Sequence, residues 1–222
     1  MSSPTIVFDL DGTLIDTAPD LVATLTVILT REGVSPLTYD AARNLVGRGA
    51  KVARGLELEG RSCPPPRLED LFSDFIEHYS EHLTERSQPF PGVTDALDAL
   101  SEHGYQFAVC TNKLESLSTN LLKHHDLAKR FVAICGPDTF GIEKPDPEIL
   151  RRTVARAGGT LERAIMIGDS IVDIHTARAA GIPIIAVDFG YSERPVADFG
   201  PDQTISSFAQ LPTSIADVSQ NI

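Results

Sequence analysis

Beyond residue 89 the chain alternates short apolar runs with longer segments of helical periodicity. Short apolar runs between turn residues are typical of buried strands, and the intervening segments have the length of helices. Strands that alternate with helices pair in parallel, because each helix carries the chain back across the sheet. We therefore expect an α/β fold with a doubly wound parallel sheet, with strands at 105–110, 132–135, 164–167 and 183–187 and helices at 93–103, 114–125, 147–157 and 170–180.

The N-terminal part adds one more strand and then changes character. Residues 6–8 form an apolar run that leads into an Asp-x-Asp-Gly turn. Thr17 is expected to begin a helix that Gly33 ends, with Asp20 in the position of a capping-box acid. Further helices are predicted at 39–46, 51–58 and 68–83, with a loop at the proline run 63–66. The predicted organisation is an α/β core formed by 1–13 and 89–222, interrupted by a small all-helical domain at 14–88.

Composition narrows the classes of function. The chain has 222 residues, which suffice for a core with an insert, and 42% hydrophobic residues to fill it. A formal charge of −12 argues against nucleic acid and anionic membranes as partners. No run reaches the roughly 18 apolar residues of a membrane span, and no signal peptide is expected. Three cysteines without paired spacing favour a reducing compartment, so we expect a soluble cytoplasmic protein.

Polar side chains follow several of the predicted strands at the point where each strand ends. Asp9 and Asp11 follow the first strand, Thr111 and Asn112 the second, and Asp169 another. Lys144 follows the remaining one after a loop. Ligands of open parallel sheets bind at the carboxyl ends of the strands, so these groups are expected to converge on one crevice.

The acidic residues in this crevice point to a divalent cation. Asp9 and Asp11 lie two apart, so in an extended segment both carboxylates face the same way and repel each other and Asp169. Hard oxygen ligands suit Mg²⁺, and Asp173, one helical turn after Asp169, can support the metal shell. Thr111 and the start of the following helix offer an anion site. Together with the point charge of Lys144, these groups are suited to phosphoryl transfer.

Four motifs carry a resemblance to a known family. Asp9-Leu10-Asp11-Gly12-Thr13, Thr111-Asn112-Lys113, Lys144-Pro145 and Gly168-Asp169-Ser170-Ile171-Val172-Asp173 resemble, in order and context, the motifs of the haloacid dehalogenase superfamily. The helical insert resembles the small cap of that superfamily. The start of the insert at 14–20 and the later run 189–191 are similar to phosphoglycolate phosphatases.

The resemblance implies a mechanism and a set of site residues. Asp9 would attack phosphorus and form an aspartyl-phosphate, and Asp11 would act as general acid and then base. Mg²⁺ would be held by Asp9, Asp169 and the backbone carbonyl of Asp11, supported by Asp173. Thr13 and Asn112 would contact the substrate, a small phosphorylated metabolite with phosphoglycolate as the favoured example. The protein would act as a monomer or homodimer.

Other functions share part of this pattern. A phosphosugar mutase or a sugar-phosphate phosphatase would have the same core motifs. A dehalogenase is disfavoured because it has no need of the acid at Asp11. A phospho-aspartate receiver module uses a similar acidic pocket, but its phosphorylated residue follows a later strand and it lacks a helical insert.

Three further features have both a functional and a structural explanation. Arg48, between two glycines in the insert, could bind an anionic leaving group or be an exposed loop residue. His78 and His82 form a His-x-x-Glu-His pattern like that of zinc peptidases, but neighbouring Tyr79 belongs to the apolar stripe, which turns the histidines towards solvent. Cys110, inside a predicted strand, is expected to be a buried small residue and not a nucleophile.

Overall fold

The computed structural model describes residues 3–33, 38–46 and 65–219. The chain forms two compact units, one of residues Met1–Asp16 with Pro89–Ile222 and one of residues Thr17–Gln88. We call them the core unit and the helical unit. The boundary falls after Asp16, where the sequence had suggested residue 13. The helix predicted at 51–58, and Arg48, lie outside the described residues. None of the helices that the structure describes is both long and apolar enough to cross a membrane.

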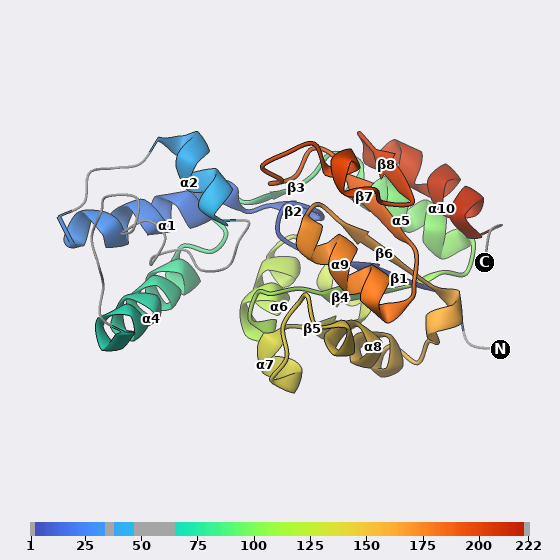
Figure 1. Ribbon diagram of the computed structural model, residues 1–222, viewed down its shortest axis with the longest axis horizontal. Coiled ribbons are helices and arrows are strands. Elements are labelled where there is room, and N and C mark those ends of the chain that lie inside the picture. The colour runs from blue at the N-terminus through green and yellow to red at the C-terminus, as the bar shows by residue number, and fades with distance from the viewer. Residues whose placement is uncertain (1–2, 34–37, 47–64, 220–222) are drawn as a thin grey trace. The chain divides into compact units, whose positions relative to one another are not determined.

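The core unit contains a parallel sheet. Among the described residues its strands follow the order β5-β4-β1-β6-β7-β8, and every neighbouring pair is parallel. The chain adds β4 and β5 on one side of β1 and then β6, β7 and β8 on the other side. This reversal of strand order at β1 is that of a doubly wound fold, so the predicted fold class is confirmed (Figure 1). The strands are β1 (Thr5–Phe8), β4 (Gln106–Cys110), β5 (Phe131–Cys135), β6 (Ala164–Gly168), β7 (Ile184–Val187) and β8 (Gln203–Ile205).

Helices cover both faces of this sheet. Two of them, α8 (Pro147–Arg156) and α9 (Ile171–Ala180), contact each other and the middle strands on one face (Figure 1). On the other face lie α5 (Val93–Glu102) and α10 (Leu211–Ser219), which also contact each other. The connection from β4 to β5 runs through α6 (Glu115–His124), and the one from β5 to β6 through α7 (Pro137–Phe140) and α8.

The strands are buried on both sides, as expected for a parallel sheet between two helical layers. Val7 of β1 belongs to a buried cluster on the side of the sheet that α8 and α9 cover. The cluster also contains Met166 of β6, Ile149 of α8 and Ile174 of α9. Its neighbour Phe8 points the other way and packs edge to face on two further phenylalanine rings, with centroids 6.1 and 6.2 Å away. Because β1 is buried on both faces, its place in the sheet is fixed, and so is the place of Asp9 directly after it.

Two details of the sheet differ from the prediction. Strand β5 begins one residue earlier than expected, at Phe131, and its register with β4 shifts so that Val132 has no partner and is exposed. Strand β8 and helix α10 were not predicted. The strand has only three residues, of which Ile205 alone is buried, so it carries almost no periodic signal.

The helical unit packs three described helices. They are α1 (Ala18–Arg31), α2 (Tyr39–Val46) and α4 (Pro65–Glu81), and α1 contacts both of the others. Their shared core includes Leu25 and Ile28 from α1 and the stacked rings of Phe75 and Tyr79 from α4. Two short strands, β2 (Ile15–Asp16) and β3 (Gln88–Pro89), form a separate two-stranded sheet.

Two local predictions for this unit were wrong. Residues 63–66 were expected to be a loop, but Pro65 and Pro66 are already the first residues of α4. A helix tolerates proline in its first turn, because no hydrogen bond is expected from those nitrogens. Thr17 makes no side-chain cap, and Asp20 instead accepts hydrogen bonds from the amides of Arg86 and Ser87. Asp20 thus ties the beginning of the unit to its end.

Candidate active site

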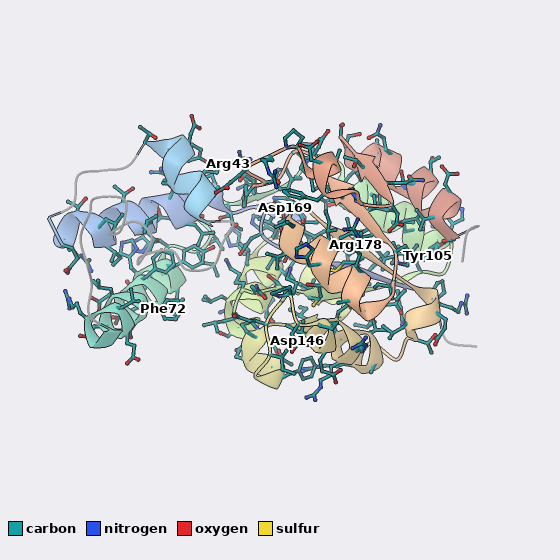
Figure 2. The ribbon with its side chains drawn as sticks, viewed as in Figure 1. Arg43, Phe72, Tyr105, Asp146, Asp169 and Arg178 are labelled. Carbon is teal, nitrogen blue, oxygen red and sulfur yellow. The ribbon has the colours of Figure 1, made fainter. Side chains whose placement is uncertain are left out.

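The candidate site lies at the carboxyl ends of the central strands. Asp9 directly follows β1, Thr111 follows β4 and Asp169 follows β6. Figure 2 shows Asp169 beside the start of α9, whereas Tyr105, which precedes β4, lies at the opposite end of the core unit. The three strands are neighbours and parallel, so their ends bring these side chains together as the sequence suggested.

Lys144 connects two of the acidic residues. Its ammonium lies 2.9 Å from Oδ1 of Asp9 and 2.6 Å from Oδ1 of Asp173, and all three side chains are largely buried. The Asn112 side chain fixes the Lys144 backbone, since it donates to the Lys144 carbonyl at 2.9 Å and accepts from the Lys144 amide at 2.8 Å. Asn112 therefore positions Lys144, and the substrate contact expected of it from the sequence stays a prediction.

Asp169 is held from two sides. The backbone N–H of Tyr191 donates to Oδ2 at 2.6 Å, and the Thr13 hydroxyl lies 3.4 Å from Oδ1. Two glycines make this approach possible: a Cβ on Gly12 would come within 2.4 Å of Oδ2, and one on Gly190 within 2.2 Å of the Asp169 Cβ. Thr13, proposed as a substrate contact, is fully buried against Asp169.

Burial and crowding shift the acid–base properties of these groups. Burial raises the pKa of Asp9 to about 6, against the opposing charge of Lys144 and with a further rise from Asp173. The pKa of Asp169 is raised well above its usual value by burial and then by the charges of Asp173 and Asp9. Burial lowers the pKa of Lys144, but Asp173 and Asp9 outweigh this and raise it overall, so Lys144 is a cation.

The carboxylates form a donor set that suits a divalent cation. Oxygens of Asp9, Asp169 and Asp173 lie within 4.8 Å of one another, and all three residues are buried. Burial is the main reason why the pKa values of Asp9 and Asp169 are raised, and neighbouring carboxylates add to it, so a bound cation would favour the charged form of both residues. Hard carboxylate oxygens around an excess of negative charge are what Mg²⁺ requires, so the residues present fit this ion.

Asp173 and Asp11 have additional partners. Oδ2 of Asp173 accepts hydrogen bonds from the amide of Ser170 at 3.1 Å and from its hydroxyl at 2.7 Å, which caps α9. Together with the Lys144 contact, this favours a supporting role for Asp173 over direct metal ligation. The Asp11 carboxylate lies 3.1 and 3.2 Å from the ammonium of Lys113.

Lys113 and Tyr191 were not assigned roles from the sequence. Lys113 stands inside the quoted Thr-Asn-Lys motif, and its position three residues after Cys110, the last residue of β4, was a usable signal. Tyr191 holds Asp169 through its backbone N–H, which any residue carries, and its hydroxyl donates to Oδ1 of Asp16 at 2.7 Å. The usable signal for Tyr191 was the resemblance of 189–191 to phosphoglycolate phosphatases.

Two other candidate features are the Cys110 thiol and the pair of histidines His78 and His82. Cys110 is fully buried in β4, and burial raises the pKa of its thiol to about 12, so it is not a ready nucleophile. The rings of His78 and His82 stack with centroids 4.1 Å apart, and His78 Nδ1 lies 3.1 Å from the Thr24 hydroxyl. Within the ranges that the structure describes, these histidines do not belong to a group of three metal-ligand atoms.

Comparisons with known proteins bear on this site. The family model of the haloacid dehalogenase-like hydrolases matches residues 6–187. A phosphoglycolate phosphatase of Mesorhizobium japonicum is 44% identical over 219 residues, covering 98% of this chain and 96% of that protein. One from Agrobacterium fabrum is 44% identical over 211 residues, covering 94% and 91%. The crystal structure of a predicted phosphoglycolate phosphatase from Haemophilus somnus superimposes with a TM-score of 0.87 at 25% identity, covering 96% and 98%.

The chain belongs to the haloacid dehalogenase-like hydrolases. Within that family it is an enzyme of the phosphatase class, as its relatives are. This assignment favours a catalyst over the receiver-like signalling module considered from the sequence.

Proposed function

We propose that this enzyme is a Mg²⁺-dependent phosphatase of small phosphate monoesters, with 2-phosphoglycolate as the substrate, acting through an aspartyl-phosphate on Asp9. The observation that carries the proposal is the fixed orientation of the Asp9 carboxylate. Its Oδ1 accepts from the Leu10 amide at 2.7 Å and lies 2.9 Å from the Lys144 ammonium. Because both contacts use the same oxygen, Oδ2 is the atom we assign as nucleophile.

Two displacements follow from this assignment. In the first, Oδ2 of Asp9 bonds to phosphorus while the ester oxygen departs and takes a proton from Asp11. In the second, Asp11 removes a proton from a water molecule that attacks the phosphorus, which releases phosphate and restores the Asp9 carboxylate. Lys144 and the Thr111 hydroxyl would stabilise the charge on the phosphoryl oxygens. A bound Mg²⁺, for which we propose Asp9, Asp169 and the Asp11 carbonyl as ligands, would supply Lewis-acid charge.

The choice of substrate rests on the relatives. Phosphoglycolate phosphatases from two organisms match this chain at 44% identity over nearly its whole length. We further propose that the helical unit serves as a cap that selects the substrate, with Arg48 as one contact, and that the enzyme acts in the cytoplasm as a monomer or homodimer. The lack of paired cysteine spacing supports that location.

A panel of phosphate esters tests the proposal. Phosphate release is measured from phosphoglycolate, hexose phosphates and alkyl phosphates with an uncharged leaving group, with Mg²⁺ and with a chelator. We expect phosphoglycolate to have the highest kcat/KM and the chelator to abolish turnover. A product that is an isomeric sugar phosphate, formed without release of inorganic phosphate, would indicate a mutase. Full activity in the chelator would contradict the metal assignment.

A further inference from the structure

A buried lysine lies beside the proposed general acid. The Lys113 ammonium is 3.1 Å from Oδ1 and 3.2 Å from Oδ2 of Asp11, and only 4% of the Lys113 side chain is exposed. Burying a lysine is costly unless it meets a negative charge, so such a position is unusual for a residue without a specific contact. Lys144 already serves Asp9 and Asp173, so the core unit places a second cation close to the reacting centre.

The backbone of Lys113 is fixed in place. Its amide donates to the Thr111 hydroxyl at 3.2 Å, directly after β4. Its carbonyl oxygen packs so closely on Gly136 that a Cβ there would come within 2.3 Å. These contacts hold the segment between β4 and α6 in place, and with it the base of the Lys113 side chain. The short contact between Lys113 and Asp11 therefore follows from the packing of the site.

The position of Asp11 defines what Lys113 can reach. To protonate the departing oxygen, Asp11 must lie within hydrogen-bond reach of it, about 2.6–3.2 Å. In a 2-phosphooxy carboxylate, a single carbon separates that oxygen from a carboxylate group. An ammonium that contacts Asp11 can reach this carboxylate when the leaving group is bound with its carboxylate towards Lys113. An ammonium also has three donors and rotates freely, so it can serve both anions at once.

Resting on the proposed function, we propose that Lys113 is a specificity-determining residue that binds the leaving-group carboxylate of 2-phosphooxy acids. The carboxylate on the leaving group would then add to binding, whereas an ester with an uncharged leaving group would gain nothing from the Lys113 ammonium. The substrate class is thereby narrowed to phosphate esters with a carboxylate on the adjacent carbon, the class that contains phosphoglycolate. The core unit itself would contribute to selectivity, in addition to the helical unit.

The test compares two substrates of matched size. Values of kcat/KM are measured for phosphoglycolate and for ethyl phosphate, which has no carboxylate, in the wild-type enzyme, in Lys113→Met and in Lys123→Met, an exposed lysine on α6. We expect Lys113→Met to lose at least about tenfold more on phosphoglycolate than on ethyl phosphate, mainly through KM. Lys123→Met should match the wild type on both.

Equal losses on the two substrates, or no loss on either, would overturn the inference, because Lys113 would then act only through Asp11 or not at all. If Lys113→Met does not fold, as judged by circular dichroism, Lys113→Gln is compared in the same way. A wild-type enzyme that shows no preference for phosphoglycolate would instead refute the proposed substrate. The two failures are therefore distinguishable.

Discussion

The ammonium of Lys144 lies 2.6 Å from a carboxylate oxygen of Asp173, and both side chains are almost completely buried. The same ammonium reaches Asp9. Lys144 lies in the loop before α8 and Asp173 in the first turn of α9, so their contact connects these two segments beside Asp9. The contact neutralises charge at the base of the site, and we expect it to contribute to stability and to catalysis.

Replacing the cation tests this contact. Lys144→Met would leave Asp9 and Asp173 buried without their counter-charge, which costs about 3–5 kcal/mol when one partner of a buried pair is removed. We expect a loss of that size in the free energy of unfolding in urea at pH 8, together with loss of phosphatase activity. Lys129→Met, at an exposed position, is the matched control. A change below about 1 kcal/mol would show that the pair contributes little.

The raised pKa of Asp9 predicts a pH dependence of the metal-free protein. The folded state holds the Asp9 proton more tightly than the unfolded chain, so the free energy of unfolding should fall as the pH rises from about 4 to the pKa of about 6. A shift of about two pKa units corresponds to at most about 3 kcal/mol. Urea unfolding with chelator across this range measures the effect, and Asp9→Asn should remove this contribution. A wild-type profile identical to that of Asp9→Asn would contradict the assignment.

The close packing around Asp169 predicts an unusually sensitive glycine. In Gly190→Ala the new Cβ would lie 2.2 Å from the Asp169 Cβ, so Asp169 must move. We expect a large loss of activity and of the thermal stabilisation produced by Mg²⁺ in the absence of substrate. Gly141→Ala places a methyl group in open space at a glycine with a φ of +70°, so it strains the local backbone without displacing Asp169 and should retain the Mg²⁺ response. Normal Mg²⁺ stabilisation in Gly190→Ala would show that the Asp169 position is not critical.

Asp20 is expected to stabilise the helical unit. Its carboxylate accepts from the Ser87 amide at 2.9 Å, from the Ser87 hydroxyl at 2.7 Å and from the Arg86 amide at 3.1 Å. Asp20→Ala would leave the amide and hydroxyl of buried Ser87 unpaired and remove the acceptor of the Arg86 amide, at a cost of about 3 kcal/mol. Amide hydrogen exchange should accelerate in α1 and α4 and remain unchanged in the central strands, whereas exposed Asp40→Ala should alter neither. Unchanged exchange in α1 would refute this role.

Much of the fold was predictable because it depends on burial with a regular period. The strands β1, β4, β6 and β7 are buried on both faces, so each appears as a continuous apolar run. β8 could not be recognised in this way because a three-residue edge strand with one buried residue has no period to detect. Asp20 was wrongly expected to cap the helix. A carboxylate near the start of a helix can accept hydrogen bonds from the amides of that helix or from a distant segment, and the sequence does not distinguish the two.

The site shows a similar division. The side chains of Asp9, Thr111 and Asp169 follow strand ends, and topology alone brought them together. What each neighbour does was not predictable in the same way: Asn112 turns its amide to the Lys144 backbone, and Thr13 turns to Asp169. Those orientations depend on tertiary contacts between segments more than 30 residues apart, and spacing along the chain carries no information about them.

The central claim, phosphoryl transfer to Asp9, is tested most directly by trapping the intermediate. The enzyme is mixed with phosphoglycolate and Mg²⁺, quenched in acid within one turnover, digested and analysed by tandem mass spectrometry. We predict a phosphoryl group on the Asp9 carboxylate that hydroxylamine removes and that is absent from Asp9→Asn, which should be inactive. A phosphoryl group on a different residue, or turnover that persists in Asp9→Asn, would contradict the account.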